Sequence, residues 1–249
     1  MSRRAFAQVR HYCRGLLVGG IALVSPAGAA ERVTVYYYER PPFAVTAEDG
    51  NVSGLIIDPT RAAFDRAGVA FAFEATSINR ILALIGEDQG AACSPGWYRT
   101  AARVRIAKFT DPIYRDKPPI GLASKSFPVP PGTRADDLLA GDVRLVMTDG
   151  FVYGHYLDPL IARKDPGQII HLPRPLRGAI EMVLAGHADL ALVTEEDAAA
   201  FAGAGVGGPD YPILHFPDVP AGDMRHIMCS RGVPDETIDR LNRAIDAPQ

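Results

Sequence analysis

This sequence of 249 residues has little cysteine, tryptophan or methionine: 3 Cys, 1 Trp and 5 Met. No two cysteines form a C-x-x-C pair, which argues against redox catalysis of the thioredoxin kind. Long apolar runs are also missing. The apolar stretch at 15–24 holds ten residues, about half of the ~20 that a membrane-spanning helix needs. A permanent membrane anchor is therefore not expected.

Motifs for metals and common cofactors are missing as well. The histidines after residue 30 show no H-x-H or H-x-x-x-H spacing, and no nearby cysteine or acid completes a metal-binding set. Neither a G-x-S-x-G nucleophile motif nor a phosphate-cradling lysine loop occurs. The sequence predicts no metal, no cofactor and no catalytic residue.

The first thirty residues have the composition of an export signal. Four arginines precede the apolar run, and Ser25–Ala30 then offers small residues at an A-x-A spacing. We expect 1–30 to be a cleavable signal, cut near Ala29 or Ala30, that directs the chain to the periplasm. The arginines at 3 and 4 also suit a twin-arginine signal, so the export route stays open.

Charge argues against a polyanionic partner. Removing 1–30 takes away four Arg and no acid, which leaves 22 basic and 29 acidic residues and a net charge of −7. No basic stripe with interleaved aromatic residues is present. Nucleic-acid binding is not expected.

Two cysteines, Cys93 and Cys229, remain after the signal is removed. An even pair in an oxidising compartment favours a disulfide. The alternative is a pair of buried free thiols.

Short apolar runs alternate with amphipathic ones from residue 31 onward, which predicts an α/β fold with helices on the faces of its sheets. The alternation is interrupted near the prolines of 112–131 and then resumes, so we expect two lobes. A final strand and helix must dock on one of them, and a Cys93–Cys229 bond would place them on the first. This assigns 31–120 plus 213–249 to lobe 1 and 121–212 to lobe 2, with two crossings that form a hinge.

The stretches that follow the strands are the best candidates for a site, because ligands of open α/β sheets bind beyond the carboxyl ends of the strands. After a predicted strand at 91–94, Trp97 is followed by Thr100 and Arg103. The last two lie three positions apart, on one face of a helical turn. Together they offer a hydroxyl and a planar guanidinium, which suits a carboxylate. The alternative is a solvated basic helix face.

Four ordered motifs carry a resemblance to a known family. They are Y-E-R-P-P-F at 38–43, G-L-I-I-D at 54–58, T-A-A-R at 100–103 and F-T-D-P-I-Y at 109–114. In this order and spacing they resemble the polar-amino-acid type of bacterial periplasmic solute-binding protein, family 3, over about 33–244. The resemblance implies a two-lobed, type II-like fold with parallel or mixed sheets and a two-strand hinge. It also implies a carboxylate-containing ligand in the interlobe cleft, delivery to an ABC importer, and a monomer.

The resemblance assigns roles in the first lobe. It implies that Arg103 holds the ligand carboxylate with Thr100 beside it, and that Tyr38 and Phe43 flank the ligand. The aromatic ring of Trp97 is a further cleft candidate.

The second lobe matches the family less closely. The family has Gly and hydroxyl residues at a helix start, where backbone N–H groups bind the carboxylate; here Gly150 is followed by Phe151, without hydroxyls. The missing hydroxyls argue against an ordinary α-amino acid. After the strand at 190–193 the family has an acid that binds the ligand ammonium. Thr194 falls nearest that position here, so we expect the next residue, Glu195, to take this role. The alternative for Glu195 is an acid at a helix N-terminus.

Two other functions stay open. One is an enzyme, because cyclohexadienyl dehydratase resembles this family in fold. In this chain Glu39, Asp149 or Glu195 could act as the cleft acid if burial raised the carboxyl pKa. The chain could also be a periplasmic partner or sensor that takes part in no transport.

Overall fold

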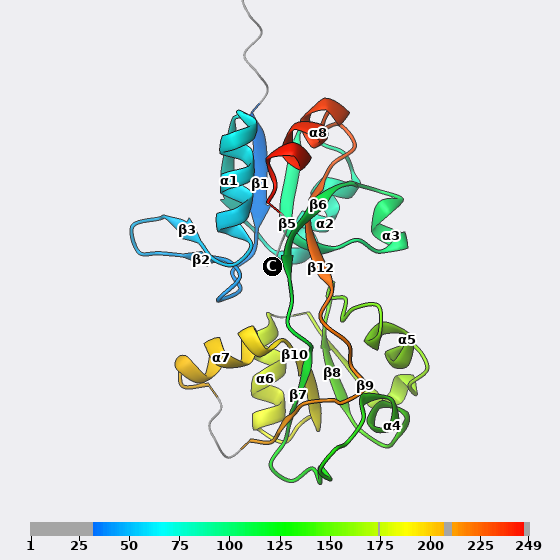
Figure 1. The fold of residues 1–249 in the computed structure, drawn as a ribbon. Helices are drawn as coiled ribbons and strands as arrows, with labels where there is room; N and C mark the ends of the chain where they lie inside the picture. Colours follow the sequence, from blue (N-terminus) through cyan, green and yellow to red (C-terminus); the bar gives the residue numbers. More distant parts are fainter. Residues whose placement is uncertain (1–31, 174, 207–210, 247–249) are drawn as a thin grey trace, which may run out of the picture. The chain divides into compact units, whose positions relative to one another are not determined.

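The computed structural model of this protein describes residues 32–173, 175–206 and 211–246 (Figure 1). The expected export signal at 1–30 lies outside these residues. The described residues contain two five-stranded sheets and a two-stranded one.

The first sheet has the strand order β4-β1-β5-β12-β6. Strands β4, β1 and β5 are parallel, whereas β12 is antiparallel to both β5 and β6. The strands are β1 (Val33–Tyr37), β4 (Phe71–Ala75), β5 (Ala92–Tyr98), β6 (Lys108–Arg115) and β12 (Met224–Cys229). A separate hairpin joins β2 (Val45–Thr46) and β3 (Val52–Ser53).

Alternation along β1 explains how helices cover both faces of this sheet. Val33, Val35 and Tyr37 pack in the core beneath α1 (Ile57–Ala67) and α8 (Asp235–Ala244). Tyr36 packs on the opposite side with Ile81 of α2 (Ile78–Gly86). A period of two is what a strand between two helical layers requires.

The ends of these helices follow from local sequence. Helix α1 ends at Gly68, whose φ of 62° is the left-handed conformation that glycine adopts readily. Helix α2 begins after Ser77, whose side chain accepts a hydrogen bond from the Arg80 backbone N–H.

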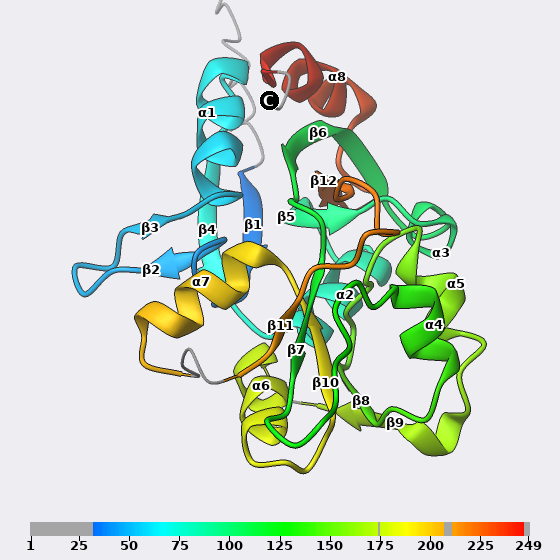
Figure 2. The same ribbon diagram turned by 60° about the horizontal axis from the view of Figure 1, so that its bottom comes forward.

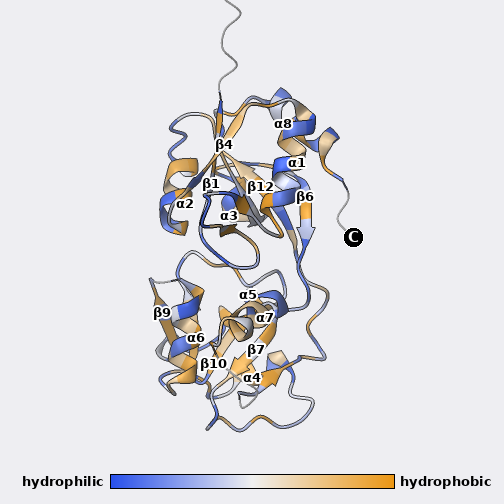
Figure 3. Cartoon of the chain, turned by 90° about the vertical axis from the view of Figure 1, so that its left-hand side faces the viewer, coloured by the Kyte–Doolittle hydropathy of each residue, from blue (hydrophilic) through white to orange (hydrophobic). Residues whose placement is uncertain are grey.

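The second sheet has the order β11-β7-β10-β8-β9 and is also mixed. Its strands are β7 (Ile120–Ala123), β8 (Leu145–Thr148), β9 (Ile169–Leu172), β10 (Leu190–Val193) and β11 (Ile213–Leu214). Leu190 and Leu192 face the core of α4 (Ala135–Ala140) and α5 (Leu157–Ile161). Ala191 and Val193 pack with α6 (Leu176–Leu184). Figure 2 shows α6 on one side of this sheet and α4 and α5 on the other. Figure 3 shows hydrophobic residues concentrated in the strands.

Two segments, 116–119 and 215–223, link the sheets (Figure 1). They lie against each other: the Asp116 backbone N–H donates to the Asp223 carbonyl at 3.1 Å. A Cβ at Gly222 would lie 2.3 Å from the Asp116 carbonyl oxygen. The double crossing agrees with the sequence prediction, but both lobe boundaries differ. The boundary at 120 places Ile120 in lobe 1, whereas Ile120 begins β7 and pairs with Val193 in the second sheet. β11 was assigned to lobe 1 by the boundary at 213, whereas it pairs with β7 in the second sheet.

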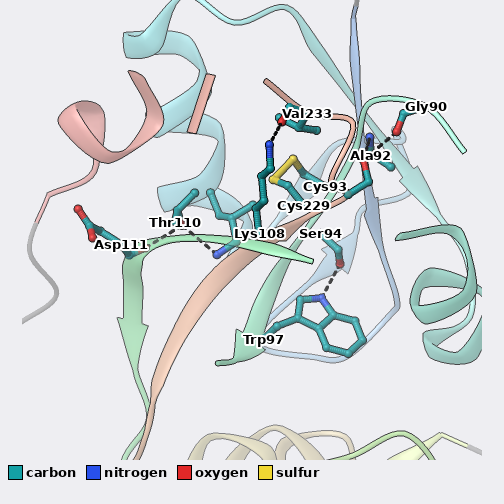
Figure 4. The surroundings of a disulfide bond; sticks show 12 residues. Gly90, Ala92, Cys93, Ser94, Trp97, Lys108, Thr110, Asp111, Cys229 and Val233 are labelled. Carbon is teal, nitrogen blue, oxygen red and sulfur yellow. Dashed lines mark hydrogen bonds between the residues drawn. A yellow bond between two sulfur atoms is a disulfide. The ribbon is translucent and has the colours of Figure 1, made fainter. Parts of the chain in front are cut away.

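The predicted Cys93–Cys229 disulfide is confirmed (Figure 4). The two residues are paired across the antiparallel strands β5 and β12. Near this bond the Lys108 ammonium donates to the Val233 carbonyl at 2.7 Å, which ties β6 to the segment before α8.

Within the part of the chain that the structure describes, no helix is both long and apolar enough to cross a membrane.

Candidate functional site

The ends of four strands meet around a small cavity of about 50 Å³. Residues that follow β1, β5, β8 and β10 contribute to its wall, as expected for ligand sites of open α/β sheets. Five of the predicted site residues line it: Tyr38, Trp97, Arg103, Gly150 and Phe151. Both sheets therefore supply wall residues of one cleft.

Arg103 lies on the one-turn helix α3 (Ala101–Val104), which Thr100 caps by accepting the Arg103 backbone N–H at 3.3 Å. Its side chain is directed into the cleft. One guanidinium nitrogen donates to the Tyr98 carbonyl at 3.2 Å and another to the Gly150 carbonyl at 3.1 Å. The guanidinium also lies over the Trp97 ring, 4.6 Å from its centroid.

Burial lowers the pKa of Arg103 to about 10, because desolvation disfavours the charged form. The residue is 9% exposed. None of the described carboxylates forms an ion pair with it. Asp158 is near enough to raise its pKa, but that carboxylate accepts the Tyr153 backbone N–H and does not line the cavity. Arg103 is thus a buried cation held by neutral acceptors.

Arg40 and Asp197 form a second charged group in the cleft. Arg40 Nε donates to Asp197 Oδ1 at 3.0 Å and Nη2 donates to Oδ2 at 2.7 Å. The two side chains are 10% and 0% exposed. The Arg40 guanidinium lies between the rings of Phe43 and Phe151, 4.6 and 4.8 Å from their centroids. This pair joins the segment after β1 to helix α7 (Glu195–Gly203), and so joins the two lobes.

A third group centres on Arg225, which is buried on β12. It donates from Nε and Nη2 to the two Asp116 oxygens, each at 2.6 Å, and from Nη1 to the Gly96 carbonyl at 2.7 Å. The Tyr98 hydroxyl donates to the same Asp116 carboxylate. The charges of Arg225 and Asp116 therefore compensate each other within this buried pair.

Outside the inner cavity the cleft widens into a groove of about 600 Å³. The cavity and the groove share Tyr38, Arg40, Ile78, Phe151 and Leu176. The rings of Tyr38 and Phe151 lie 6.2 Å apart, centroid to centroid, where the two regions join.

The other predicted ligand-binding residues do not line the cavity or the groove. Phe43 is fully buried behind Arg40 and Arg225. Thr100 acts as the helix cap. Glu195 lies 3.4 Å from Lys117 Nζ and 3.7 Å from His215 Nδ1. The acid that does line the cavity is Asp197, two residues later.

The expected helix start at Gly150 is wrong. Helix α5 begins at Leu157, and Gly150 instead turns the chain with a φ of 81°. Its carbonyl oxygen accepts a hydrogen bond from Arg103, so this position supplies an acceptor rather than a helix N-terminus. A Cβ here would lie 3.1 Å from Asn79 Oδ1 of α2.

The acids considered for a cleft enzyme have other partners. Glu39 accepts the Thr46 backbone N–H at 3.1 Å, and Asp149 lies 3.5 Å from His171 Nδ1. Both reach the outer groove but not the cavity beside Arg103.

The sequence analysis did not identify Arg40, Asp197, Arg225 or Asp116 as site residues. Asp197 had one usable signal, the spacing T-x-x-D at 194–197, which is a capping box. Arg225 and Asp116 are separated by more than a hundred residues, and nothing local marks their pairing. No group of three or more potential metal ligands occurs among the described residues.

This architecture, two mixed α/β sheets with a double crossing and a cleft between them, defines a two-lobed periplasmic binding-protein fold. The family model of the bacterial extracellular solute-binding proteins, family 3, matches residues 33–246. The chain belongs to this family.

Solved structures with the same fold include three binding proteins of low sequence identity. The arginine-, lysine-, histidine-binding protein ArtJ from Geobacillus stearothermophilus has a TM-score of 0.69 at 17% identity, covering 86% of this chain and 87% of that one. Truncated, arginine-bound ArgBP from T. maritima has a TM-score of 0.66 at 18% identity, covering 86% and 94%. The ancestral amino acid-binding protein AncCDT-1, a precursor of cyclohexadienyl dehydratase, has a TM-score of 0.65 at 18% identity, covering 87% and 88%. No curated protein matches the chain.

Proposed function

We propose that this protein binds a small carboxylate-containing solute in the cleft between its lobes and delivers it to an ABC importer. In this proposal the chain is exported to the periplasm, loses residues 1–30 and acts as a monomer. Family membership supports the solute-binding role.

The observation that carries the proposal is the state of Arg103. Its guanidinium has five N–H donors, and the two hydrogen bonds to backbone carbonyls use two of them. A buried cation is stabilised by a charged, hydrogen-bonded partner. A solute carboxylate would provide that partner.

Closure follows from the same contacts. The bonds from Arg103 to Gly150 and from Arg40 to Asp197 both cross between the lobes. Solute entry therefore requires the lobes to separate, and bonds to both lobes would favour the closed state. A binding role is preferred to a lyase for a different reason. None of the acids considered for catalysis lines the cavity beside Arg103.

The test is calorimetry on residues 31–249 with a panel of amino acids, other carboxylates and amines. Hydrogen bonds to charged groups contribute about 1.5–3 kcal/mol, so Arg103→Ala should weaken binding of the best solute at least about tenfold. The exposed neighbour Arg99 gives a matched control, Arg99→Ala, which should bind as the unmodified protein does.

Melting temperatures of both variants show whether they fold. If Arg103→Ala is folded and keeps the original affinity, Arg103 does not hold the solute. An amine from the panel as the preferred solute would contradict the carboxylate proposal.

A further inference from the structure

Among the described residues, the charges around the cavity leave one cation without an ionic partner. Three guanidinium groups, those of Arg40, Arg103 and Arg225, line the cavity. Two are paired with carboxylates, Arg40 with Asp197 and Arg225 with Asp116. The remaining charge is that of Arg103, so this part of the cleft favours a solute with one net negative charge.

An ammonium group, in contrast, would find no available carboxylate among the described residues that line the cavity. Asp197 Oδ2 already accepts from Arg40 and from the Thr194 backbone N–H and hydroxyl, and Oδ1 accepts from Arg40. The carboxylate of Glu195 lies outside the cavity wall beside Lys117. A solute ammonium would therefore be desolvated near three guanidinium groups, which is unfavourable.

The space available for the rest of the solute is mainly apolar. The inner cavity, at about 50 Å³, has room for little more than a small head group. The adjoining groove of about 600 Å³ is within the range of small-molecule pockets. Its hydrophobic wall includes Ile78, Phe151, Pro175, Leu176 and Phe201.

The charged residues of the groove have partners of their own. Glu39 is bonded to Thr46, Asp149 lies beside His171, and Arg177 donates to Glu181 at 2.8 Å. They leave the hydrophobic wall as the main contact surface for a solute body.

We infer that the solute is a monocarboxylate with an apolar body and no ammonium group, its carboxylate at Arg103 and its body in the groove. This inference rests on the proposed function and narrows its substrate class. Arg40 takes the place next to Asp197 that a solute ammonium would need.

The test uses pairs of probes that differ only in the ammonium group. These are 3-phenylpropanoate with L-phenylalanine, and 4-methylpentanoate with L-leucine. Calorimetry on residues 31–249 should show at least one carboxylate binding at least about tenfold more tightly than its amino acid. The uncharged 3-phenylpropan-1-ol should bind more weakly than 3-phenylpropanoate.

Equal or tighter binding of the amino acids, or no binding by any probe, would overturn the inference. The outcome for the proposed function is decided by a separate measurement. It stands if some solute of the earlier panel binds and is weakened by Arg103→Ala.

A second arm reverses the preference. Arg40→Met removes the guanidinium and leaves Asp197 to accept an ammonium, so the affinity for L-phenylalanine relative to 3-phenylpropanoate should rise at least about tenfold. Arg99→Met is the matched control on an exposed arginine.

The double variant Arg40→Met, Asp197→Asn carries no unpaired buried charge at this position and serves if the single variant fails to fold. It should keep the preference for 3-phenylpropanoate, because Arg103 is unchanged. A double variant that prefers L-phenylalanine would overturn the inference, as would an unchanged preference in a folded Arg40→Met variant.

Discussion

Arg40 and Asp197 are 157 residues apart in the chain and form a two-point ion pair, with N–O distances of 3.0 and 2.7 Å. Each comes from a different lobe, and the aspartate is fully buried. A parallel pair of charged hydrogen bonds fixes both the distance and the orientation of the groups it joins. The pair therefore sets how the segment after β1 lies against α7.

Breaking this pair from one side should be costly. Removing one partner of a buried ion pair leaves an uncompensated charge, which typically costs about 3–5 kcal/mol. We expect this loss of unfolding free energy for Asp197→Asn and for Arg40→Met, measured by urea denaturation. The double variant should lose clearly less than the sum of the two, because it leaves no unpaired charge. Strictly additive losses would show that the two residues do not interact energetically.

Gly222 should tolerate no side chain. Its Cβ position lies 2.3 Å from the Asp116 carbonyl oxygen and 2.4 Å from that of Lys117. Gly222→Ala must push the two crossing segments apart, and overpacking of this kind costs about 1–3 kcal/mol. The matched control is Gly203→Ala at the end of α7, where no atom of the described residues lies within 4 Å of the Cβ position. That change should leave the melting temperature equal or slightly higher. Equal stability of Gly222→Ala and the unmodified protein would contradict the close approach.

His226 should make the protein less stable in mild acid. Its Nδ1 lies 2.7 Å from the Thr110 carbonyl oxygen, which only accepts, so the ring donates from Nδ1. Burial is the main cause that lowers the pKa of His226 below its ordinary 6.5. Nearby Arg99 lowers the pKa further, while the Thr110 carbonyl and Asp111 oppose the shift.

The sign of the effect follows from proton binding. Below about pH 6.5, His226 binds a proton in the unfolded chain but remains neutral in the folded chain, where its pKa is lower. The free energy of unfolding therefore falls as the pH drops toward the folded-state pKa. Between about pH 7.5 and about pH 5.5, His226→Gln should therefore lose less stability than the unmodified protein in urea denaturation. The exposed His187→Gln is the control. Identical pH dependence in all three proteins would rule out this role for His226.

The order of helices and strands was largely predictable, because hydrophobic periodicity and chain breakers are local signals. Gly68 ends α1 and Ser77 caps α2 as such residues usually do. The pairing of β11 was not predictable in the same way. Two residues carry too little pattern to say which sheet they join, and the pairing with β7 depends on the path of the whole crossing segment.

The site was predictable on the side that follows β5 and only in part elsewhere. Trp97 lies near the carboxyl end of β5 and Arg103 follows that strand, where sequence position alone suggests a cleft. The ion pairs of Arg40 and Arg225 join residues far apart in the chain, so their geometry exists only once both lobes have formed. The acid at the cavity was expected at Glu195, whereas the capping geometry of Thr194 turns Asp197 inward and leaves Glu195 beside Lys117.

The Cys93–Cys229 bond closes a covalent ring that runs from residue 93 to residue 229 and contains the whole second sheet with its helices. A protease that cuts once anywhere in this ring leaves the polypeptide joined through sulfur. The two pieces stay one molecule until a reductant separates them, so nicked and intact protein migrate as one covalent species under oxidising conditions.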